Sequence, residues 1–363
     1  MEVSVLQDGL DLGFRRLTVA SVDRLTADSV AITFDVPPGL SEQFRFRAGQ
    51  HLTLRRVVAG VDVRRTYSVC SSAAGGPLRV AVKRLPGGAF SSRIVESLRA
   101  GDELDVLPPT GRFGPRVDPT RTRHYGLIAA GSGITPLLSI ACTVLDVEPH
   151  SQVTLVYGNR TSADIMFLDE LADLKDRHPT RLQLLHVLSR EQQETELLSG
   201  RLDPHRVERL LRTLVPADAI DEWYLCGPFT MVTGARQALH EAGVQPAAVH
   251  VELFFADPLP SRTPPPPRAS TDLATVTVVL HGRASTVQVD PAGAPVLDAV
   301  LAVRADAPYA CRGGVCGTCR ARCTSGAVTL DVNWALEPDE LAAGVVLTCQ
   351  AHPATPEVRL EYL

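Results

Sequence analysis

Four cysteines toward the C-terminal end of the chain have a spacing that suits an iron–sulfur cluster. Cys311, Cys316, Cys319 and Cys349 form the pattern C-x4-C-x2-C-x29-C, which holds a [2Fe–2S] cluster through four thiolates. A zinc ribbon would need two C-x-x-C pairs, and here only Cys316 and Cys319 form one. Because such a cluster carries one electron at a time, we expect the rest of the chain to supply or remove single electrons.

The remaining cysteines do not suggest a disulfide framework. They are scattered, and no signal peptide is recognised, so we expect free thiols and a cytoplasmic protein. The glycines among the ligands are expected to let the ligand loop turn sharply. The scattered cysteines are Cys70, Cys142, Cys226 and Cys323, and the last of them is interpreted as a structural or spare thiol.

Two motifs in the first hundred residues predict a flavin site. Arg65, Tyr67 and Ser68 offer a guanidinium for a diphosphate, a ring that can stack on a flavin, and a hydroxyl for a ring nitrogen. About twenty residues later a glycine-rich segment precedes an expected helix at 92–98, and N–H groups at a helix N-terminus bind phosphate. An exposed strand could carry either motif alone, but together and in this order they favour FAD. The second segment comprises Gly87, Gly88, Ala89, Phe90 and Ser91.

Two further motifs predict a nicotinamide dinucleotide site. The run Gly131-Ser-Gly-Ile-Thr-Pro136 follows an expected strand and precedes a helix, where a pyrophosphate lies in a doubly wound sheet, although it lacks the G-x-G-x-x-G fingerprint. Cys226, Gly227 and Pro228 follow another expected strand, where a nicotinamide could approach. A buried structural thiol is the alternative for Cys226. The first run contributes Gly131, Ser132, Gly133, Thr135 and Pro136 as predicted ligands.

Ser189 and Arg190 end a third expected strand of this region. An arginine there can bind the 2′-phosphate of NADPH in a bidentate manner, so NADPH is predicted, with NADH as the alternative. The chain has 36 Lys and Arg residues in total, and only two of them are lysines, so a solvated surface arginine is the competing interpretation.

The elements that must position these residues fall into three regions. Six short strands between residues 17 and 106 predict an antiparallel β-barrel. Apolar strands alternating with amphipathic helices between 125 and 254 predict an α/β doubly wound parallel sheet. The expected domains are an FAD-binding barrel at 1–118, an NAD(P)-binding domain at 119–256, a proline-rich linker at 257–272 and an α+β ferredoxin-like [2Fe–2S] domain at 273–363.

Composition excludes several other classes of protein. A net charge of −5 argues against a nucleic-acid partner. Residues 126–145 are uncharged and apolar, but the glycine run at 131–136 divides them, so no membrane span is expected.

The order of the motifs resembles the ferredoxin–NADP reductase superfamily, with a plant-type ferredoxin joined at the C-terminal side. Residues 46–54, 155–161 and 336–344 further resemble the reductase subunits of ring-1,2-phenylacetyl-CoA epoxidases, while similar reductases serve 3-ketosteroid 9α-hydroxylases and other aromatic oxygenases. The resemblance covers residues 15 to 360 approximately. It implies an NADPH-dependent reductase that passes electrons through FAD and the cluster to an oxygenase partner, with di-iron epoxidase subunits expected.

The resemblance also implies roles for individual residues. Arg65, Tyr67 and Ser68 would contact the flavin, and the motifs at 131–136 and 226–228 would contact the nicotinamide cofactor. Ser189 and Arg190 match the pair of residues that binds the 2′-phosphate. Glu252 and Phe254 correspond to positions near the flavin in some relatives, although the chain continues beyond them here. Ser68, Cys226 and Glu252 are therefore the predicted catalytic residues.

Overall fold

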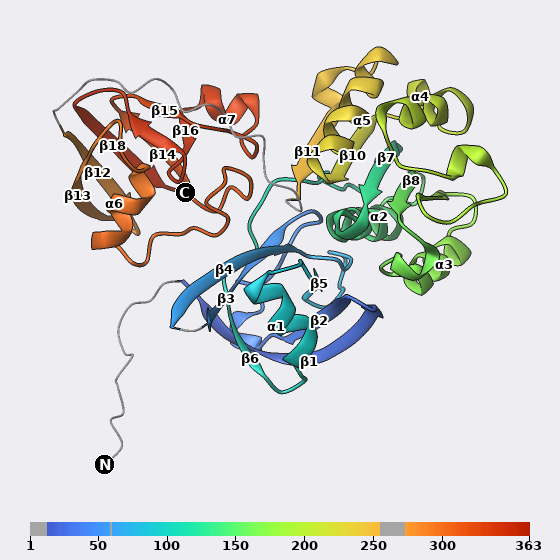
Figure 1. Ribbon diagram of the computed structural model, residues 1–363, viewed down its shortest axis with the longest axis horizontal. Coiled ribbons are helices and arrows are strands. Elements are labelled where there is room, and N and C mark those ends of the chain that lie inside the picture. Colours follow the sequence, from blue (N-terminus) through green and yellow to red (C-terminus); the bar gives the residue numbers. More distant parts are fainter. Residues whose placement is uncertain (1–12, 59, 255–272) are drawn as a thin grey trace. The chain divides into compact units, whose positions relative to one another are not determined.

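The structure, a computed structural model, describes residues 13–58, 60–254 and 273–363, which form two compact units (Figure 1). Strands β1 to β11 belong to one unit and strands β12 to β18 to the other. The first twelve residues and the predicted linker at 257–272 lie outside the described residues.

The first six strands form an antiparallel sheet with the order β4-β3-β6-β1-β2-β5. The two edge strands meet through a bridge between Val69 and Val80, and the Cys70 N–H donates to the Arg79 carbonyl at 2.9 Å. The sheet therefore closes on itself, which confirms the predicted barrel. Its elements are β1 (Arg15–Thr26), β2 (Ser29–Asp35), β3 (His51–Val58), β4 (Val61–Ser68), β5 (Arg79–Lys83), α1 (Ala89–Ser97) and β6 (Glu103–Val106).

The next five strands form a parallel sheet with the order β11-β10-β7-β8-β9. The strand order reverses between β7 and β10, which makes their carboxyl ends the switch point where ligands bind in doubly wound folds. The predicted α/β sheet is thus confirmed. Its elements are β7 (His124–Ala130), α2 (Ile134–Val147), β8 (Gln152–Asn159), α3 (Leu168–Arg177), β9 (Leu182–Leu188), α4 (Pro204–Thr213), β10 (Glu222–Gly227), α5 (Phe229–Glu241) and β11 (Val249–Leu253).

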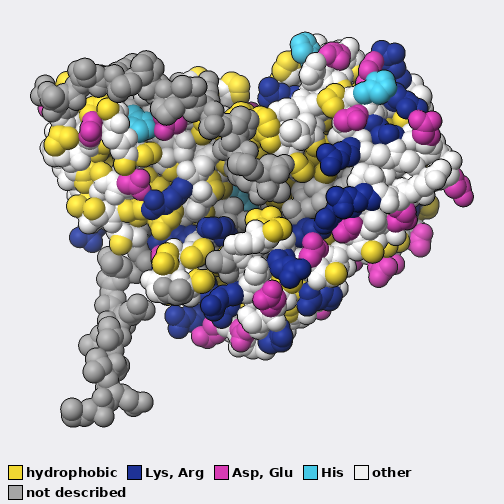
Figure 2. Space-filling model, viewed as in Figure 1, with side chains coloured by type: hydrophobic (Ala, Val, Ile, Leu, Met, Phe, Trp, Pro, Cys, Tyr) yellow, Lys and Arg dark blue, Asp and Glu magenta, His cyan; other side chains and the backbone are white. Residues whose placement is uncertain are grey.

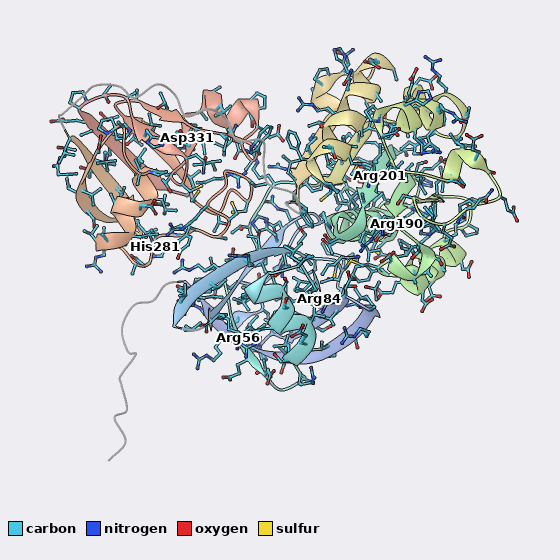
Figure 3. The ribbon with its side chains drawn as sticks, viewed as in Figure 1. Arg56, Arg84, Arg190, Arg201, His281 and Asp331 are labelled. Atoms are coloured by element: carbon cyan, nitrogen blue, oxygen red, sulfur yellow. The ribbon has the colours of Figure 1, made fainter. Side chains whose placement is uncertain are left out.

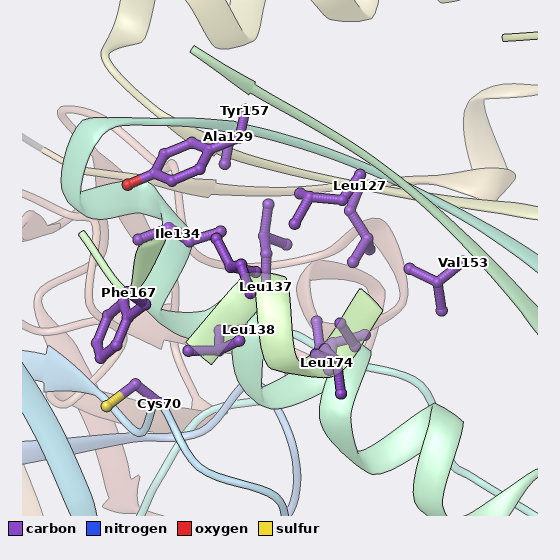
Figure 4. Packing of buried hydrophobic residues seen from close by; sticks show 14 of the residues in the cluster. Cys70, Leu127, Ala129, Ile134, Leu137, Leu138, Val153, Tyr157, Phe167 and Leu174 are labelled. Carbon is purple, nitrogen blue, oxygen red and sulfur yellow. The ribbon is translucent and has the colours of Figure 1, made fainter. Parts of the chain in front are cut away.

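The barrel and the parallel sheet share one packed core. Cys70, which follows the barrel strand β4, lies beside Leu138 and Phe167 in the cluster that α2 and α3 build on the sheet (Figure 4). The Arg79 guanidinium binds Glu170 with two hydrogen bonds of 2.8 and 2.9 Å and also lies over the Phe167 ring. Apolar packing and a bidentate ion pair therefore hold the two sheets together.

A buried carboxylate fixes the segment that joins these two sheets. Glu148 is fully buried at the end of α2 and accepts hydrogen bonds from the Tyr125 hydroxyl at 3.1 Å and the Ser151 hydroxyl at 2.6 Å. The Asp118 N–H, on the connecting segment, also donates to it at 3.0 Å. Since a buried carboxylate is costly unless its oxygens are satisfied, these three donors lock the connection in place.

The second unit is built on a mixed five-stranded sheet with the order β13-β12-β18-β14-β16, and β15 pairs with β17 separately. Strand β18 lies at the centre of the sheet, parallel to β12 and antiparallel to β14. The α+β ferredoxin-like fold is confirmed. Its elements are β12 (Ala274–Leu280), β13 (Arg283–Val289), α6 (Val296–Val303), β14 (Arg320–Ser325), β15 (Val328–Leu330), α7 (Pro338–Ala342), β16 (Val345–Leu347), β17 (Ala351–Pro353) and β18 (Glu357–Tyr362).

The apolar run at 126–145 is divided as expected between the end of β7, a short 3-10 turn and α2. None of the helices in the described ranges combines the length and the apolar character needed to cross a bilayer.

Candidate functional site

The end of strand β4 presents the predicted flavin residues on both of its faces. Arg65 and Tyr67 are two residues apart on the strand, so the guanidinium and the phenol share one face. Ser68 follows Tyr67 directly, so its hydroxyl lies on the other face. The Tyr67 ring stacks on the Phe90 ring of α1, with centroids 6.0 Å apart and planes 27° apart. Burial raises the pKa of Tyr67, so the phenol stays neutral and offers a flat apolar face.

Helix α1 begins at Ala89, three residues earlier than predicted, because Gly88 serves as its N-cap. Within the described residues no side chain caps this end, which leaves the first N–H groups of the helix available to an anion. The Ser91 hydroxyl accepts from the Leu85 N–H at 3.0 Å and holds the preceding turn. Gly87 has a positive φ of 73° that only glycine adopts easily. An uncapped helix N-terminus near Tyr67 fits a diphosphate.

The three predicted catalytic residues lie together. The Ser68 hydroxyl donates to Glu252 Oε2 at 3.1 Å, and Glu252 pairs in register with Cys226 on the neighbouring strand β10. Burial raises the pKa of Glu252 to about 7, against an opposing effect of the Ser68 hydrogen bond. Burial, with the nearby Glu252 carboxylate, raises the pKa of Cys226 well above its usual range. Near neutral pH the Glu252 carboxyl can therefore hold or release a proton beside Ser68, while Cys226 remains a neutral thiol.

The glycine run at the switch point packs directly on β10. Gly131–Gly133 forms a 3-10 turn that leads into α2. A Cβ on Gly133 would lie 2.5 Å from the carbonyl carbon of Cys226 and closer still to its oxygen. The Tyr157 hydroxyl donates to the Gly131 carbonyl at 2.9 Å. Only a glycine at 133 lets the turn approach the strand this closely.

The other members of this run are engaged within the protein. The Thr135 hydroxyl is buried and donates to the Ser132 carbonyl at 3.0 Å, so it holds the turn. Pro136 lies in the first turn of α2, where a missing N–H costs no helical hydrogen bond. On the facing side, Gly227 ends β10 and Pro228 is the N-cap of α5. The two predicted nicotinamide motifs thus border the same switch point.

Ser189 and Arg190 follow β9, and the structure brings a third residue beside them. Ser199 forms a parallel bridge with Leu188, and the Gly200 N–H donates to the Leu188 carbonyl at 2.8 Å. Arg201 therefore lies at the same edge of the parallel sheet as Arg190, and both side chains are exposed. Figure 3 labels both residues, and Figure 2 shows dark blue side chains over this area.

Arg201 was not among the predicted site residues. Neither its guanidinium nor that of Arg190 has a hydrogen-bond or ion-pair partner within the described ranges. Asn159, at the end of β8, has a buried side-chain amide that is directed at the Tyr157 hydroxyl. An edge with two exposed guanidinium groups fits a phosphorylated ribose.

The four predicted cluster cysteines come together as two pairs. Hydrogen bonds from the Cys316 thiol and from backbone N–H groups lower the pKa of Cys311 below its usual range, which favours the thiolate. The Cys319 thiol likewise donates to the sulfur of Cys349. Across the described residues, no three Cys, His, Asp or Glu side chains converge as one metal ion would require. Two pairs of thiols suit two irons, each with two ligands.

The loop that holds three of the cysteines has sharp backbone turns and a buried hydroxyl beside the sulfurs, both of which suit a cluster. Gly314 and Gly317 have positive φ angles of 73° and 64°, and Arg312, which is not a glycine, also adopts 54°. The Thr318 hydroxyl, between two of the cysteines, is buried and directed at the Cys316 sulfur, where its hydrogen bond opposes the rise in the pKa of that thiol. A hydroxyl that donates to a ligand sulfur suits an iron–sulfur cluster, so the residues present fit the group.

Comparison with known proteins agrees with this geometry. Three domain families match successive parts of the chain: an oxidoreductase FAD-binding domain at 16–114, an oxidoreductase NAD-binding domain at 127–237 and a 2Fe-2S iron-sulfur cluster binding domain at 278–354. A 1,2-phenylacetyl-CoA epoxidase component from Escherichia coli (strain K12) is 45% identical over 96% of this chain and 98% of that protein. The ferredoxin reductase component of 3-ketosteroid-9-alpha-monooxygenase from Rhodococcus rhodochrous is 34% identical over 95% and 96%.

The chain belongs to the reductases of multicomponent oxygenases. The reductase is an NAD(P)H-dependent flavin and iron–sulfur oxidoreductase that transfers electrons through FAD and a [2Fe–2S] cluster to an oxygenase. Its fold is shared by phthalate dioxygenase reductase, with a TM-score of 0.57 and 24% identity over 96% of this chain and 98% of that chain. An intact type IV self-sufficient cytochrome P450 monooxygenase shares it too, with a TM-score of 0.69 and 24% identity, over 98% of this chain and 43% of that one.

Proposed function

We propose that this reductase serves a phenylacetyl-CoA epoxidase and takes its electrons from NADPH. The observation that carries the choice of oxygenase is the 45% identity to the epoxidase component over 98% of its length, against 34% for the ketosteroid monooxygenase component. Its partners would be the di-iron epoxidase subunits. The four cysteines outside the proposed cluster site form no disulfide, which supports a cytoplasmic location.

The proposal divides the first compact unit near residue 118, with the flavin held on the barrel side. Arg65 and the N-terminus of α1 would neutralise the FAD diphosphate, and Tyr67 would lie against the flavin ring. Bound FAD would supply the change from two-electron to one-electron chemistry, and the cluster would carry single electrons onward. The chain's own part is to bind, orient and shield these groups.

The residues at the end of β4, β10 and β11 would control access to the flavin. Ser68 would face the flavin ring, and Glu252 would orient the Ser68 hydroxyl by accepting its hydrogen bond, which leaves the oxygen of that hydroxyl as an acceptor for the ring. Cys226, buried and neutral, would present an apolar sulfur where the nicotinamide approaches. This role is supported by the 3.1 Å contact between Ser68 and Glu252 and by the register of Glu252 with Cys226.

The choice of NADPH depends on the edge beyond β9. Ser189, Arg190 and Arg201 would bind the 2′-phosphate, which NADH lacks. Two guanidinium groups can each donate two charge-assisted hydrogen bonds to one phosphate, so the discrimination should be large.

A reductase for a 3-ketosteroid 9α-hydroxylase is the second candidate, since that component matches over 95% of the chain. Reconstitution separates the two candidates. The purified holoprotein is mixed with phenylacetyl-CoA epoxidase catalytic subunits, and NADPH-dependent loss of phenylacetyl-CoA is followed. The same protein is assayed in parallel with the ketosteroid oxygenase component and its substrate. We expect turnover only with the epoxidase. Turnover only with the ketosteroid oxygenase would overturn the choice of partner while leaving the reductase assignment intact.

A further inference from the structure

A buried ion pair lies directly against the cluster loop of the ferredoxin domain. Arg320 is the first residue of β14 and follows the ligand Cys319, while Glu340 lies on α7. Arg320 Nε and Glu340 Oε1 are 3.2 Å apart, and the two side chains are only 16% and 6% exposed. Because both charges are largely removed from water, solvent screens their field weakly.

The guanidinium is held in one position by contacts on all three of its nitrogens. Nη1 donates to the Gly317 carbonyl at 3.2 Å, Nη2 donates to the Ala335 carbonyl at 3.0 Å, and Nε binds Glu340. A Cβ on Gly317 would lie 2.5 Å from the Cζ atom of Arg320. The guanidinium therefore rests on the loop segment between Cys316 and Cys319.

The carboxylate is fixed as firmly as its partner. Glu340 Oε2 accepts from the Glu337 N–H at 3.1 Å, which completes a capping box at the start of α7. The guanidinium contacts the cluster loop itself, and the carboxylate contacts the guanidinium. The two charges consequently act on the cluster with opposite signs from fixed positions.

We propose that Arg320 and Glu340 form a matched pair that sets the reduction potential of the cluster. The proposal rests on the cluster ligands proposed above. Accepting one electron adds a negative charge to the cluster, which a nearby cation stabilises and a nearby carboxylate opposes. Arg320 raises the potential, and Glu340 restrains that rise. Both are positioning residues rather than ligands.

The test measures the potential in the purified full-length holoprotein by redox titration with dithionite, monitored by the electron paramagnetic resonance of the reduced cluster. Arg320→Met should lower the potential, and Glu340→Gln should raise it. Each should change the one-electron equilibrium constant about tenfold, which corresponds to about 59 mV. The double variant should return close to the wild-type value, since both charges are then absent.

Two further variants separate electrostatics from mere structural support. Arg322→Met removes the same charge from an exposed position two residues along the same strand, and we expect less than a threefold change because water screens it. Arg320→Lys keeps the charge but loses the planar donor set, so it should hold the potential while binding iron less durably.

Shifts of opposite sign for the two single variants support the proposal. Shifts in the same direction, or none in either variant, overturn it, because a purely structural pair would disturb the loop alike from both sides. Should Arg320→Met fail to assemble a cluster, Glu340→Gln decides alone: a rise supports the proposal, and a fall or no change overturns it. The titration needs neither NADPH nor an oxygenase, so its outcome is independent of the proposed partner.

Discussion

Replacing Gly133 by alanine tests the close approach between the glycine turn and β10. Gly133 has φ −62° and ψ −7°, an ordinary conformation for alanine, so the effect of the added methyl group is purely steric. That methyl would lie 2.5 Å from the carbonyl carbon of Cys226 and 2.7 Å from the Gly227 nitrogen. Since non-bonded carbon atoms prefer about 3.5 Å or more, the turn and the strand must separate by about 1 Å.

A separation of that size has two measurable consequences. Overpacking should lower the free energy of unfolding by about 1–3 kcal/mol. A misplacement of about 1 Å beside the nicotinamide site should reduce kcat/KM for flavin reduction by about 100-fold. The FAD content and the dithionite-reduced cluster should be unchanged, because neither is held by this turn.

The assay is anaerobic stopped-flow reduction of the bound flavin over a range of NADPH concentrations. Gly39→Ala is the matched control, since a Cβ there meets no atom within 4 Å. Flavin reduction at the wild-type rate and with unchanged NADPH dependence in the Gly133 variant would refute the reasoning.

Three other predictions follow from the site. Because burial raises the pKa of Glu252 from 4.5 to about 7, the native protein should lose stability relative to Glu252→Gln as pH rises from 4.5 to 7, by at most about 3 kcal/mol, and then no further. Denaturant titrations across pH check this, and a pH-independent difference would contradict it. Cys316→Ser should abolish the signal of the reduced cluster while Cys323→Ser retains it; equal iron contents would argue against the ligand set. Arg190→Ala and Arg201→Ala should each raise KM about tenfold for NADPH but not for NADH, and equal changes for both cofactors would exclude a 2′-phosphate site.

Local motifs made much of this site predictable from the sequence. Three of the cluster cysteines and the residues 65–68 each lie within a short segment, so their spacing along the chain already determines their neighbours in space, and Cys349 was found because the complete C-x4-C-x2-C-x29-C spacing is typical of a cluster. The strands and helices were predictable for a similar reason, because burial follows the period of each element. Helix α1 began earlier than predicted, since Gly88 caps it without any side chain that would mark the cap.

Contacts between segments that are distant in the sequence were harder to predict. Ser68 and Glu252 are separated by 184 positions, and only resemblance to relatives suggested that Glu252 belongs near the flavin. Arg201 depends on the bridge between Leu188 and Ser199, and nothing in an arginine-rich chain distinguishes it beforehand. Arg320 could not be predicted as a site residue either, because its ion pair with Glu340 on α7 forms only when the chain has folded.

The central place of β18 in the ferredoxin sheet has a consequence for biosynthesis. This strand is made after all four predicted cluster ligands, yet it lies between β12 and β14. While residues 357–362 are still inside the ribosome, the sheet behind the ligand loop has a gap, and the backbone groups of β12 and β14 that pair with β18 have no strand to bind. Iron that reached the nascent chain at this stage would bind a ligand loop whose supporting sheet is still incomplete. Stable cluster assembly should therefore follow synthesis of β18, after the sheet behind the ligand loop is complete.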